Sequence, residues 1–193
     1  MVLAMGLLSA CASTPEFPPA PTVRFDQARA KQLLEEGSAT VAGKVLLRLS
    51  TGGALTCAKG TVRLIPFTAY ASAWADTVYY QQSPESGTPA DLAYLIKSKR
   101  MPDARLDARF LATNRTARCD QDGQFIFEKV QDGDYFLEAD LIWQQDIYDE
   151  LHFFRGREYY DKEGTVLKRF LLQGGKPVFL DLQWSIKNKR FNF

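Results

Sequence analysis

The stretch DYFLEADLIW, residues 134–143, alternates apolar and polar side chains. Its odd-numbered positions are apolar throughout: Tyr135, Leu137, Ala139, Leu141 and Trp143. Glu138 and Asp140 stand between them and are expected to face away from the core. Because successive side chains of a β-strand point to opposite faces, this period of two predicts a strand with one buried face.

The same period recurs on both sides of this stretch. It is found in TVAGKVLLRL (40–49), TVRLIPF (61–67), GQFIFEKV (123–130), VLKRFLL (166–172) and KPVFLDLQW (176–184). The turn-forming sequences STGG, QDG, QDGD and QGGKP lie among these stretches. Several short amphipathic strands joined by turns predict an all-β chain folded as a β-sandwich.

The composition is that of an ordinary globular domain. The chain has 193 residues, of which 46% are hydrophobic, and a net charge of +1. This length suits one domain with a core of normal size, which does not need a metal for stability. The near-neutral charge gives no general attraction to nucleic acid. No apolar run reaches the roughly 18 residues that a membrane-spanning helix needs.

Two segments depart from the strand period. FDQARAKQLLEEG (25–37) has apolar residues near helical spacing, so we expect a short N-terminal helix that stops at Gly37. Residues 82–113 are polar and lack a strand period, apart from a possible helical turn at DLAYLIKSK (91–99). We predict that they form a long insertion between two strands and that they do not build the core.

The N-terminus contains a short apolar run that ends at Leu8-Ser9-Ala10-Cys11. The run has the length of the apolar region of a signal peptide, but no Lys or Arg precedes Arg24, so the signal is truncated or atypical. The four residues resemble the lipobox of bacterial lipoproteins. The resemblance implies removal of residues 1–10 and lipidation of Cys11, with a diacylglycerol on sulfur and an acyl chain such as palmitate on nitrogen. A disordered N-terminus is the alternative.

The residues after Cys11 extend this interpretation. Ala12 and Ser13 follow the cysteine, a pattern that resembles the outer-membrane signal of enterobacterial lipoproteins. The proline-rich stretch STPEFPPAPT (13–22) predicts an extended tether. Residues 11–37 are therefore expected to form a lipidated tether and short helix, since two or more acyl chains hold a protein stably at a bilayer.

The chain has three cysteines, Cys11, Cys57 and Cys119. If Cys11 carries lipid, two remain, and the export route leads to an oxidising compartment. We therefore predict a disulfide between Cys57 and Cys119. Two separate buried thiols are the alternative.

Four motifs then occur in order: Val41-Ala-Gly43-Lys-Val45, Val62-Arg-Leu64-Ile-Pro66, Asp120-Gln-Asp-Gly123-Gln-Phe125-Ile-Phe127 and Val130-Gln-Asp-Gly133-Asp-Tyr135. Together they resemble carboxypeptidase regulatory-like domains. The resemblance implies a transthyretin-like, or prealbumin-like, Greek-key sandwich of about seven strands, which we place at residues 38–193. Gly123 and Gly133 are expected to adopt the backbone angles of tight turns. The cysteine pair, which brackets the insertion, also resembles a bacterial subset of such proteins.

Motifs for catalysis and cofactors are weak. His152 is the single histidine, and no HxxE pair accompanies it, so a catalytic zinc is not expected. DQDG (120–123) lacks the flanking acids of an EF-hand, because Arg118 and Lys129 stand at ligand positions, and it predicts a strand turn. The chain has neither a GxSxG elbow nor a phosphate-binding GxxxxGK[ST] sequence. We expect a protein that is not an enzyme and has no cofactor.

Basic side chains gather in the predicted insertion. They are Lys97, Lys99, Arg100, Arg105 and Arg109. We predict that they bind a partner and are mostly unmatched by local acids, while a solvated face is the simpler interpretation. Tyrosines such as Tyr79 and Tyr80 are candidates for aromatic contacts at an interface.

These features predict a lipid-anchored protein of the bacterial envelope, most simply at the outer membrane and facing the periplasm. Its expected role is that of a structural or protein-interaction module with an envelope protein as partner. A carbohydrate- or peptidoglycan-binding module is the alternative, because sandwich loops with exposed aromatic residues suit it. A hydrolase is the third hypothesis.

Overall fold

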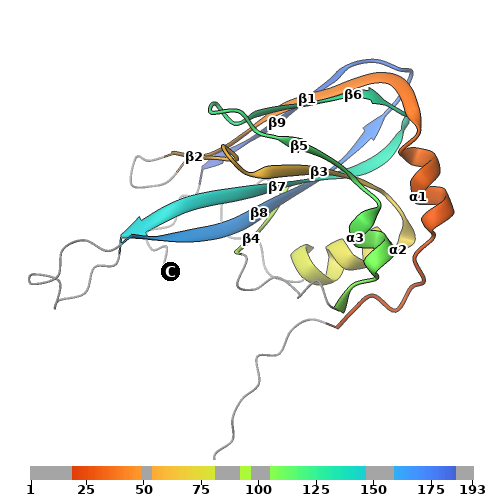
Figure 1. Cartoon of the computed structure of the whole chain (residues 1–193), viewed down its shortest axis with the longest axis horizontal. Coiled ribbons are helices and arrows are strands. Elements are labelled where there is room, and N and C mark those ends of the chain that lie inside the picture. The colour runs from red at the N-terminus through yellow and green to blue at the C-terminus, as the bar shows by residue number, and fades with distance from the viewer. Residues whose placement is uncertain (1–18, 49–53, 81–91, 97–104, 147–158, 186–193) are drawn as a thin grey trace, which may run out of the picture.

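The computed structural model describes residues 19–48, 54–80, 92–96, 105–146 and 159–185, which form three layers (Figure 1). Two β-sheets face each other, and short helices cover the outer face of the second sheet. The predicted all-β sandwich is therefore confirmed. Nine strands occur among the described residues, against about seven expected, because the shortest strands, β2 and β5, are too brief to show a period.

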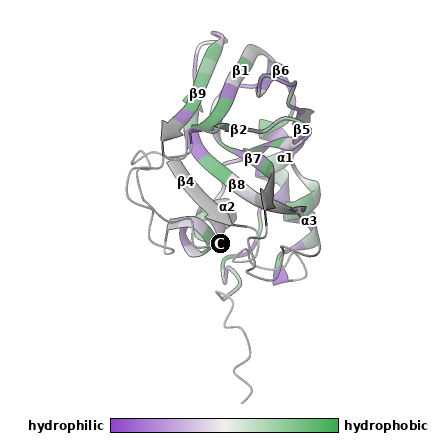
Figure 2. Cartoon of the chain, turned by 90° about the vertical axis from the view of Figure 1, so that its left-hand side faces the viewer, coloured by the Kyte–Doolittle hydropathy of each residue, from purple (hydrophilic) through white to green (hydrophobic). Residues whose placement is uncertain are grey.

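The first sheet is built around β1 (Glu36–Arg48). Strands β6 (Gln124–Val130) and β2 (Ala54–Thr56) pair with it antiparallel, and β9 (Val178–Ser185) pairs with it parallel. Figure 2 shows bands of hydrophobic and hydrophilic residues along β1 and β9, as expected for strands with one buried face.

The second sheet has the order β4-β8-β7-β3-β5. Its strands are β4 (Leu92–Ile96), β8 (Tyr159–Leu172), β7 (Gly133–Asp146), β3 (Thr61–Pro66) and β5 (Arg115–Arg118). All of their pairings are antiparallel. The long strands β7 and β8 pair at the centre of this sheet, and β7 contains the alternating stretch 134–143.

The first core lies between the two sheets and follows the predicted alternation. Tyr135, Leu137, Ala139 and Leu141 of β7 are all buried there. They meet the inward residues of β1, among which Val41, Val45 and Leu47 are fully buried. A side chain of this size contributes roughly 1.5–3 kcal/mol when it leaves water, so this layer supplies much of the stability.

The second core lies between the second sheet and three short helical elements. These are α2 (Ala69–Ala75), the π-helical turn η1 (Asp76–Tyr80) and α3 (Ala108–Ala112). Thr68 caps α2 by accepting a hydrogen bond from the backbone N–H of Ala71 at 3.1 Å, which fixes where the helix begins. The buried face of α2 contains Tyr70 and Trp74, which pack toward the sheet with Phe136 of β7.

Two predictions for residues 82–113 are wrong: the possible helical turn at 91–99 and the exclusion of the segment from the core. Residues 92–96 form strand β4, which pairs with β8 at the edge of the second sheet. Leu106 and Phe110 are buried in the second core, beside the aromatic residues of α2. The segment looked like a polar loop because α3 has five residues and buries a single large side chain, which is too few for a visible period.

The N-terminal helix α1 (Gln27–Leu33) is confirmed. Asp26 caps it by accepting from the Arg29 backbone N–H at 3.0 Å, and Ala30 and Leu33 are its buried residues. The expectation that Gly37 ends this helix is wrong, because Gly37 lies within β1.

Tyr135 anchors α1 to the sandwich. Its hydroxyl donates to the Leu33 carbonyl at 2.6 Å and to the Gln131 carbonyl at 2.7 Å. Burial, together with the negative charge of Asp132, raises the pKa of Tyr135 to about 12.

Gly123 and Gly133, both predicted to adopt the backbone angles of tight turns, are glycines for different physical reasons. Gly123 has a φ of +77°, which favours glycine, and the Asp120 carboxylate accepts from the backbone N–H groups of Asp122 and Gln124. This confirms the strand turn at DQDG. Gly133 does not have a positive φ, so the expected turn angle is wrong for it. A Cβ at Gly133 would instead lie 2.6 Å from the Leu33 side chain, where α1 packs against the sheet.

The predicted disulfide between Cys57 and Cys119 is confirmed. Cys57 lies between β2 of the first sheet and β3 of the second, and Cys119 lies between β5 and β6, where the chain returns. The bond therefore links the two segments at which the chain crosses between the sheets, and it closes a loop that contains α2, η1 and α3.

In the part of the chain that the structure describes, no helix is long and apolar enough to cross a membrane.

Candidate binding site

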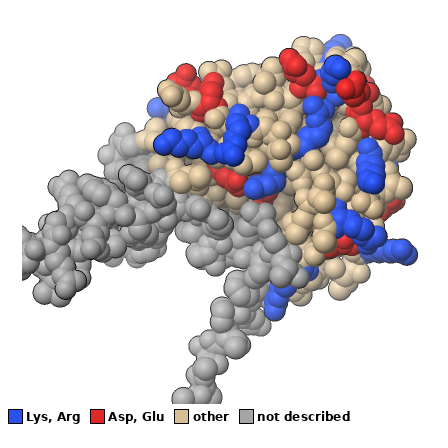
Figure 3. Space-filling view, viewed as in Figure 1, with Lys and Arg blue, Asp and Glu red and all other residues tan. Residues whose placement is uncertain are grey.

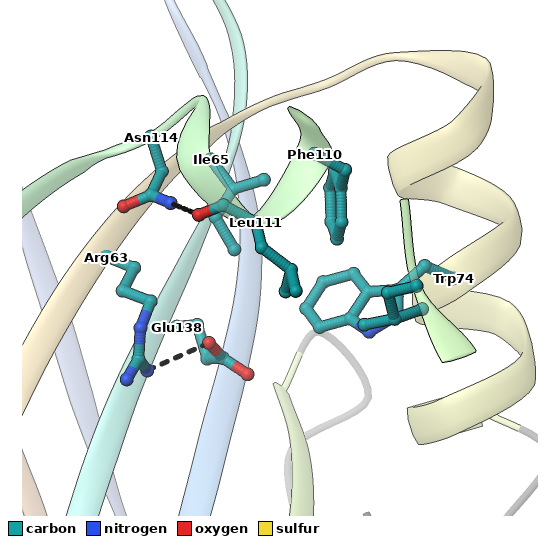
Figure 4. A pocket seen from close by; sticks show the side chains of 8 residues that line it. Arg63, Ile65, Trp74, Phe110, Leu111, Asn114 and Glu138 are labelled. Carbon is teal, nitrogen blue, oxygen red and sulfur yellow. Dashed lines mark hydrogen bonds and ion pairs between the residues drawn. The ribbon is translucent and has the colours of Figure 1, made fainter. Parts of the chain in front are cut away.

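A cavity of about 150 Å³ lies between the second sheet and its helical layer (Figure 4). Strands β3 and β7 form one wall, and α2 and α3, with the residues flanking α3, form the other. Its polar lining residues are Arg63, Asn114 and Glu138, and its apolar lining residues are Ile65, Trp74, Leu106, Phe110 and Leu111.

The polar wall is an ion pair between neighbouring strands. Arg63 of β3 lies directly opposite Glu138 of β7 in the strand register, and its Nη1 donates to Glu138 Oε2 at 3.0 Å. The same guanidinium binds both carboxylate oxygens of Asp140, at 2.9 and 3.1 Å. Arg63 is thus held by two carboxylates of the same strand, β7.

Glu138 faces away from the first core, as predicted, but it does not face solvent. Its side chain is 1% exposed because the helical layer covers it. Its Oε1 accepts from the Tyr79 hydroxyl at 2.6 Å, and that hydroxyl also bonds Thr165 Oγ1 of β8 at 2.8 Å. A buried carboxylate is costly unless it is paired and hydrogen-bonded, and these contacts meet that need.

The electrostatics of this wall favour charged Arg63. Burial alone would lower the pKa of the Arg63 guanidinium, but its hydrogen bonds to Asp140 and the negative charges of Glu138 and Asp140 outweigh burial and raise the pKa overall. Arg63 therefore remains a cation, held by hydrogen bonds to both carboxylates.

The apolar wall is aromatic. Trp74 of α2 and Phe110 of α3 lie with their ring centroids 5.4 Å apart. Figure 4 shows these two rings on one side and the Arg63–Glu138 pair on the other, with Leu111 reaching between them. Trp74 is 1% exposed, and its indole Nε1–H has no hydrogen-bond partner among the described residues, which is unusual for a buried donor.

This arrangement suits a small ring-shaped ligand with both polar and apolar faces. A cavity of about this size accommodates a benzene-sized molecule. Aromatic rings opposite hydrogen-bonding groups can contact C–H groups on one side of a ligand and hydroxyl groups on the other. Among the described residues, no group of carboxylate, histidine or cysteine side chains could hold a metal ion.

The predicted basic surface is not assembled as expected. Arg109 lies on α3 and pairs with Asp107, whose Oδ2 lies 2.6 Å from Arg109 Nη2, so it is matched by a local acid. This pair lowers the pKa of Asp107 and raises the pKa of Arg109. Arg105 is exposed next to Leu106, which lines the cavity. Figure 3 shows acidic and basic side chains interspersed over the described face.

Several other predictions fall on residues that are not described. Cys11, Lys97, Lys99, Arg100 and His152 lie outside the described ranges. Tyr79 is buried, so its predicted role as an exposed aromatic contact is wrong. The side chain of Tyr80 is likewise not described.

The residues of the cavity were not identified from the sequence. A usable signal existed for α2, because Tyr70, Ala71, Trp74, Ala75 and Val78 follow helical spacing after the capping residue Thr68. Glu138 carried no such signal, since a polar residue within an alternating strand is normally exposed.

Comparisons with known proteins bear on the fold. No family model matches the chain, and no curated protein matches it. A solved structure from Pseudomonas aeruginosa, of "a putative carbohydrate binding protein", is similar, with a TM-score of 0.56 and 22% sequence identity. The match covers 82% of this chain and 97% of that one. At this identity the similarity shows a shared fold.

Proposed function

We propose that this chain is a non-enzymatic binding protein of the bacterial envelope, and that its cavity holds one unit of a carbohydrate. The observation that carries the proposal is the aromatic wall of Trp74 and Phe110 opposite the Arg63–Glu138 pair. Sugars have apolar C–H faces and hydroxyl rims, so both walls of the cavity have a complementary partner. The carbohydrate-related name of the protein of similar fold agrees with this assignment.

The proposed attachment to the envelope rests on the lipobox-like sequence at Cys11 and on the resemblance to carboxypeptidase regulatory-like domains. A lipid on Cys11 and the tether after it would hold the sandwich near a membrane surface, at the outer membrane facing the periplasm. Changing Cys11 to Ser should move the protein from the membrane fraction to the soluble fraction. Unchanged fractionation of protein expressed from its native start would contradict the anchor.

Carbohydrate binding is tested by filling the cavity. Leu111 is partly buried and reaches into the cavity, so Leu111→Trp should block a ligand while adding apolar contacts. Leu171→Trp is the matched control, because Leu171 is 56% exposed on β8. Calorimetric titration with a panel of mono- and oligosaccharides should show binding by the wild type and Leu171→Trp, and none by Leu111→Trp. Equal binding by both variants would place the ligand elsewhere.

A second candidate function, a protein-interaction module, is favoured by the outer face of the first sheet. Ile126, Ala42 and Phe179 stand side by side on β6, β1 and β9, and Ile126 and Phe179 are 55% and 64% exposed. Apolar side chains in one exposed row are typical of an interface. Crosslinking in native membranes should lose a partner protein in the double variant Ile126→Ser/Phe179→Ser, and an unchanged crosslinking pattern would exclude this face.

A further inference from the structure

The guanidinium of Arg63 has one edge that the described part of the protein does not occupy. A guanidinium carries five N–H groups in one plane. Nη1 of Arg63 donates to Glu138 and to Asp140, and Nη2 donates to the other oxygen of Asp140. Nε–H and the second Nη2–H have no partner among the described residues. These two groups lie side by side, because Nη2 is the terminal nitrogen on the same side of the plane as Nε–H.

This open edge faces away from β7. Both carboxylates that occupy the rest of the guanidinium come from β7, and β5 is the neighbour of β3 on the opposite side. Thr116 of β5 lies directly opposite Arg63 in the strand register, so its side chain stands on the same face of the sheet. Thr116 is exposed, and its hydroxyl has no partner in the part of the chain that the structure describes.

Asn114 adds a hydrogen-bond acceptor on this side of the cavity. Its Nδ2 donates to the Leu111 carbonyl at 2.6 Å, which fixes the amide and turns Oδ1 away from Leu111. No described residue donates to this Oδ1. Figure 4 shows Asn114 and Arg63 on the same side of the cavity, across from Trp74.

Arg63 lies where the cavity meets solvent. It lines the cavity, and its side chain is 26% exposed, whereas that of Glu138 is 1% exposed. A ring that occupies the cavity can therefore present its outer rim to the open edge of Arg63.

We infer that this edge of Arg63, together with Asn114 and Thr116, recognises two adjacent hydroxyl groups of a sugar. The inference rests on the proposed carbohydrate-binding function. The two hydroxyl oxygens accept from Nε–H and Nη2–H, because this two-pronged edge suits a pair of neighbouring oxygens. One of the two hydroxyl groups donates its own proton to Asn114 Oδ1, and the Thr116 hydroxyl completes the site. A carboxylate offers two neighbouring oxygens but has no proton for Asn114, so the site favours a diol.

The test removes hydroxyl groups from the ligand one at a time. Methyl glycosides of glucose, galactose and mannose are titrated into the full chain, each intact and with each ring hydroxyl in turn replaced by hydrogen. For the best-bound sugar, loss of either member of one adjacent pair should weaken binding on the order of tenfold, because a half-buried donor is left without a partner. Arg63→Lys keeps the positive charge but not the two-pronged edge, so it should weaken binding of the intact sugar and remove this difference.

Thr116→Val is the milder variant, because Thr116 is exposed and its replacement leaves the core intact. It should weaken binding of the intact sugar several-fold, and unchanged affinity would overturn the inference even where Arg63→Lys does not fold. Thr40→Val, on β1 of the other sheet, is the matched control and should bind as the wild type does.

Two further results would overturn the inference and leave carbohydrate binding in place. One is a wild type for which the loss of no adjacent pair of hydroxyl groups weakens binding. The other is a folded Arg63→Lys variant that still distinguishes the intact sugar from its deoxygenated forms as the wild type does. Failure of all the glycosides and of the oligosaccharide panel to bind would overturn both the inference and the proposed function.

Discussion

The two faces of strand β7 show how differently one strand can be used. Toward the first sheet it presents Leu137 and Ala139, both fully buried among apolar neighbours. Toward the helices it presents Phe136 and Glu138, equally buried, but Glu138 belongs to a network of charges and hydroxyl groups beside a cavity. The first face is built for packing density. The second face retains empty volume and a costly buried charge, which is typical of a binding site.

The largest effect is expected from the disulfide between Cys57 and Cys119, which lies in the first core and links the two crossings between the sheets. Replacing Cys57 and Cys119 by Ala removes a link across 62 residues, which should lower the free energy of unfolding by about 4 kcal/mol in the chain-entropy model. Because this loop contains the whole helical layer between the two cysteines, the cavity should loosen as well. Chemical denaturation measures the loss. A loss below about 1 kcal/mol would show that the layers hold together without the bond.

A deletion in the first core should cost nearly as much. Leu137→Ala removes a fully buried side chain from β7, and the expected loss is about 3 kcal/mol because the tight packing cannot close the space. Leu171→Ala, at an exposed position of β8, should change stability by less than about 0.5 kcal/mol. Similar losses for both variants in urea denaturation would contradict the assignment of the core face.

Alkaline pH should weaken the attachment of α1. Tyr135 has its pKa raised from 10.0 to about 12 in the folded chain, so its contribution is complete below pH 10 and is lost as the pH rises toward 12. A shift of about two pKa units corresponds to roughly 3 kcal/mol. The free energy of unfolding of the wild type should therefore fall more steeply between pH 10 and 12 than that of Tyr135→Phe. Parallel pH profiles for the two proteins would show that Tyr135 does not titrate in this way.

The polar network of the second region should give the smallest loss of stability and a clear loss of binding. Tyr79→Phe removes the hydroxyl that bonds both Glu138 and Thr165, at a cost of about 1–2 kcal/mol. Because Glu138 then loses one of its fixed partners, sugar affinity should fall at the same time. Denaturation and titration of the same variant check both effects. Unchanged affinity in a folded variant would separate this network from the cavity.

The same contrast explains what could be predicted from the sequence. The first core was predictable because every inward position of β7 is apolar and the period of two is unbroken from Tyr135 to Leu141. The disulfide followed from cysteine arithmetic, once Cys11 was assigned to lipid. Both inferences depend on patterns that are local or that involve very few residues.

The cavity could not be predicted in this way. Its residues come from β3, α2, β7, α3 and the residues beside α3, which are far apart in the sequence. The helices that cover Glu138 have five to seven residues each, so their periodicity is weak, although the cap at Thr68 and the spacing of Tyr70 and Trp74 indicate α2 in retrospect. When the helical layer is not recognised, the sequence pattern predicts that Glu138 faces solvent and that Phe110 belongs to a polar loop.

The most direct test of the central claim is to observe Trp74 while a sugar is added. The chain has three tryptophans, so its indole N–H signals are few, and Trp74→Phe assigns the one at the cavity. A sugar that occupies the cavity should shift the Trp74 signal in a saturable way, with the same affinity that calorimetry gives, because the Trp74 ring lines the site and its N–H has no partner in the described part of the chain. Saturable binding that leaves the Trp74 signal in place would contradict the claim that the cavity beneath the helical layer is the binding site.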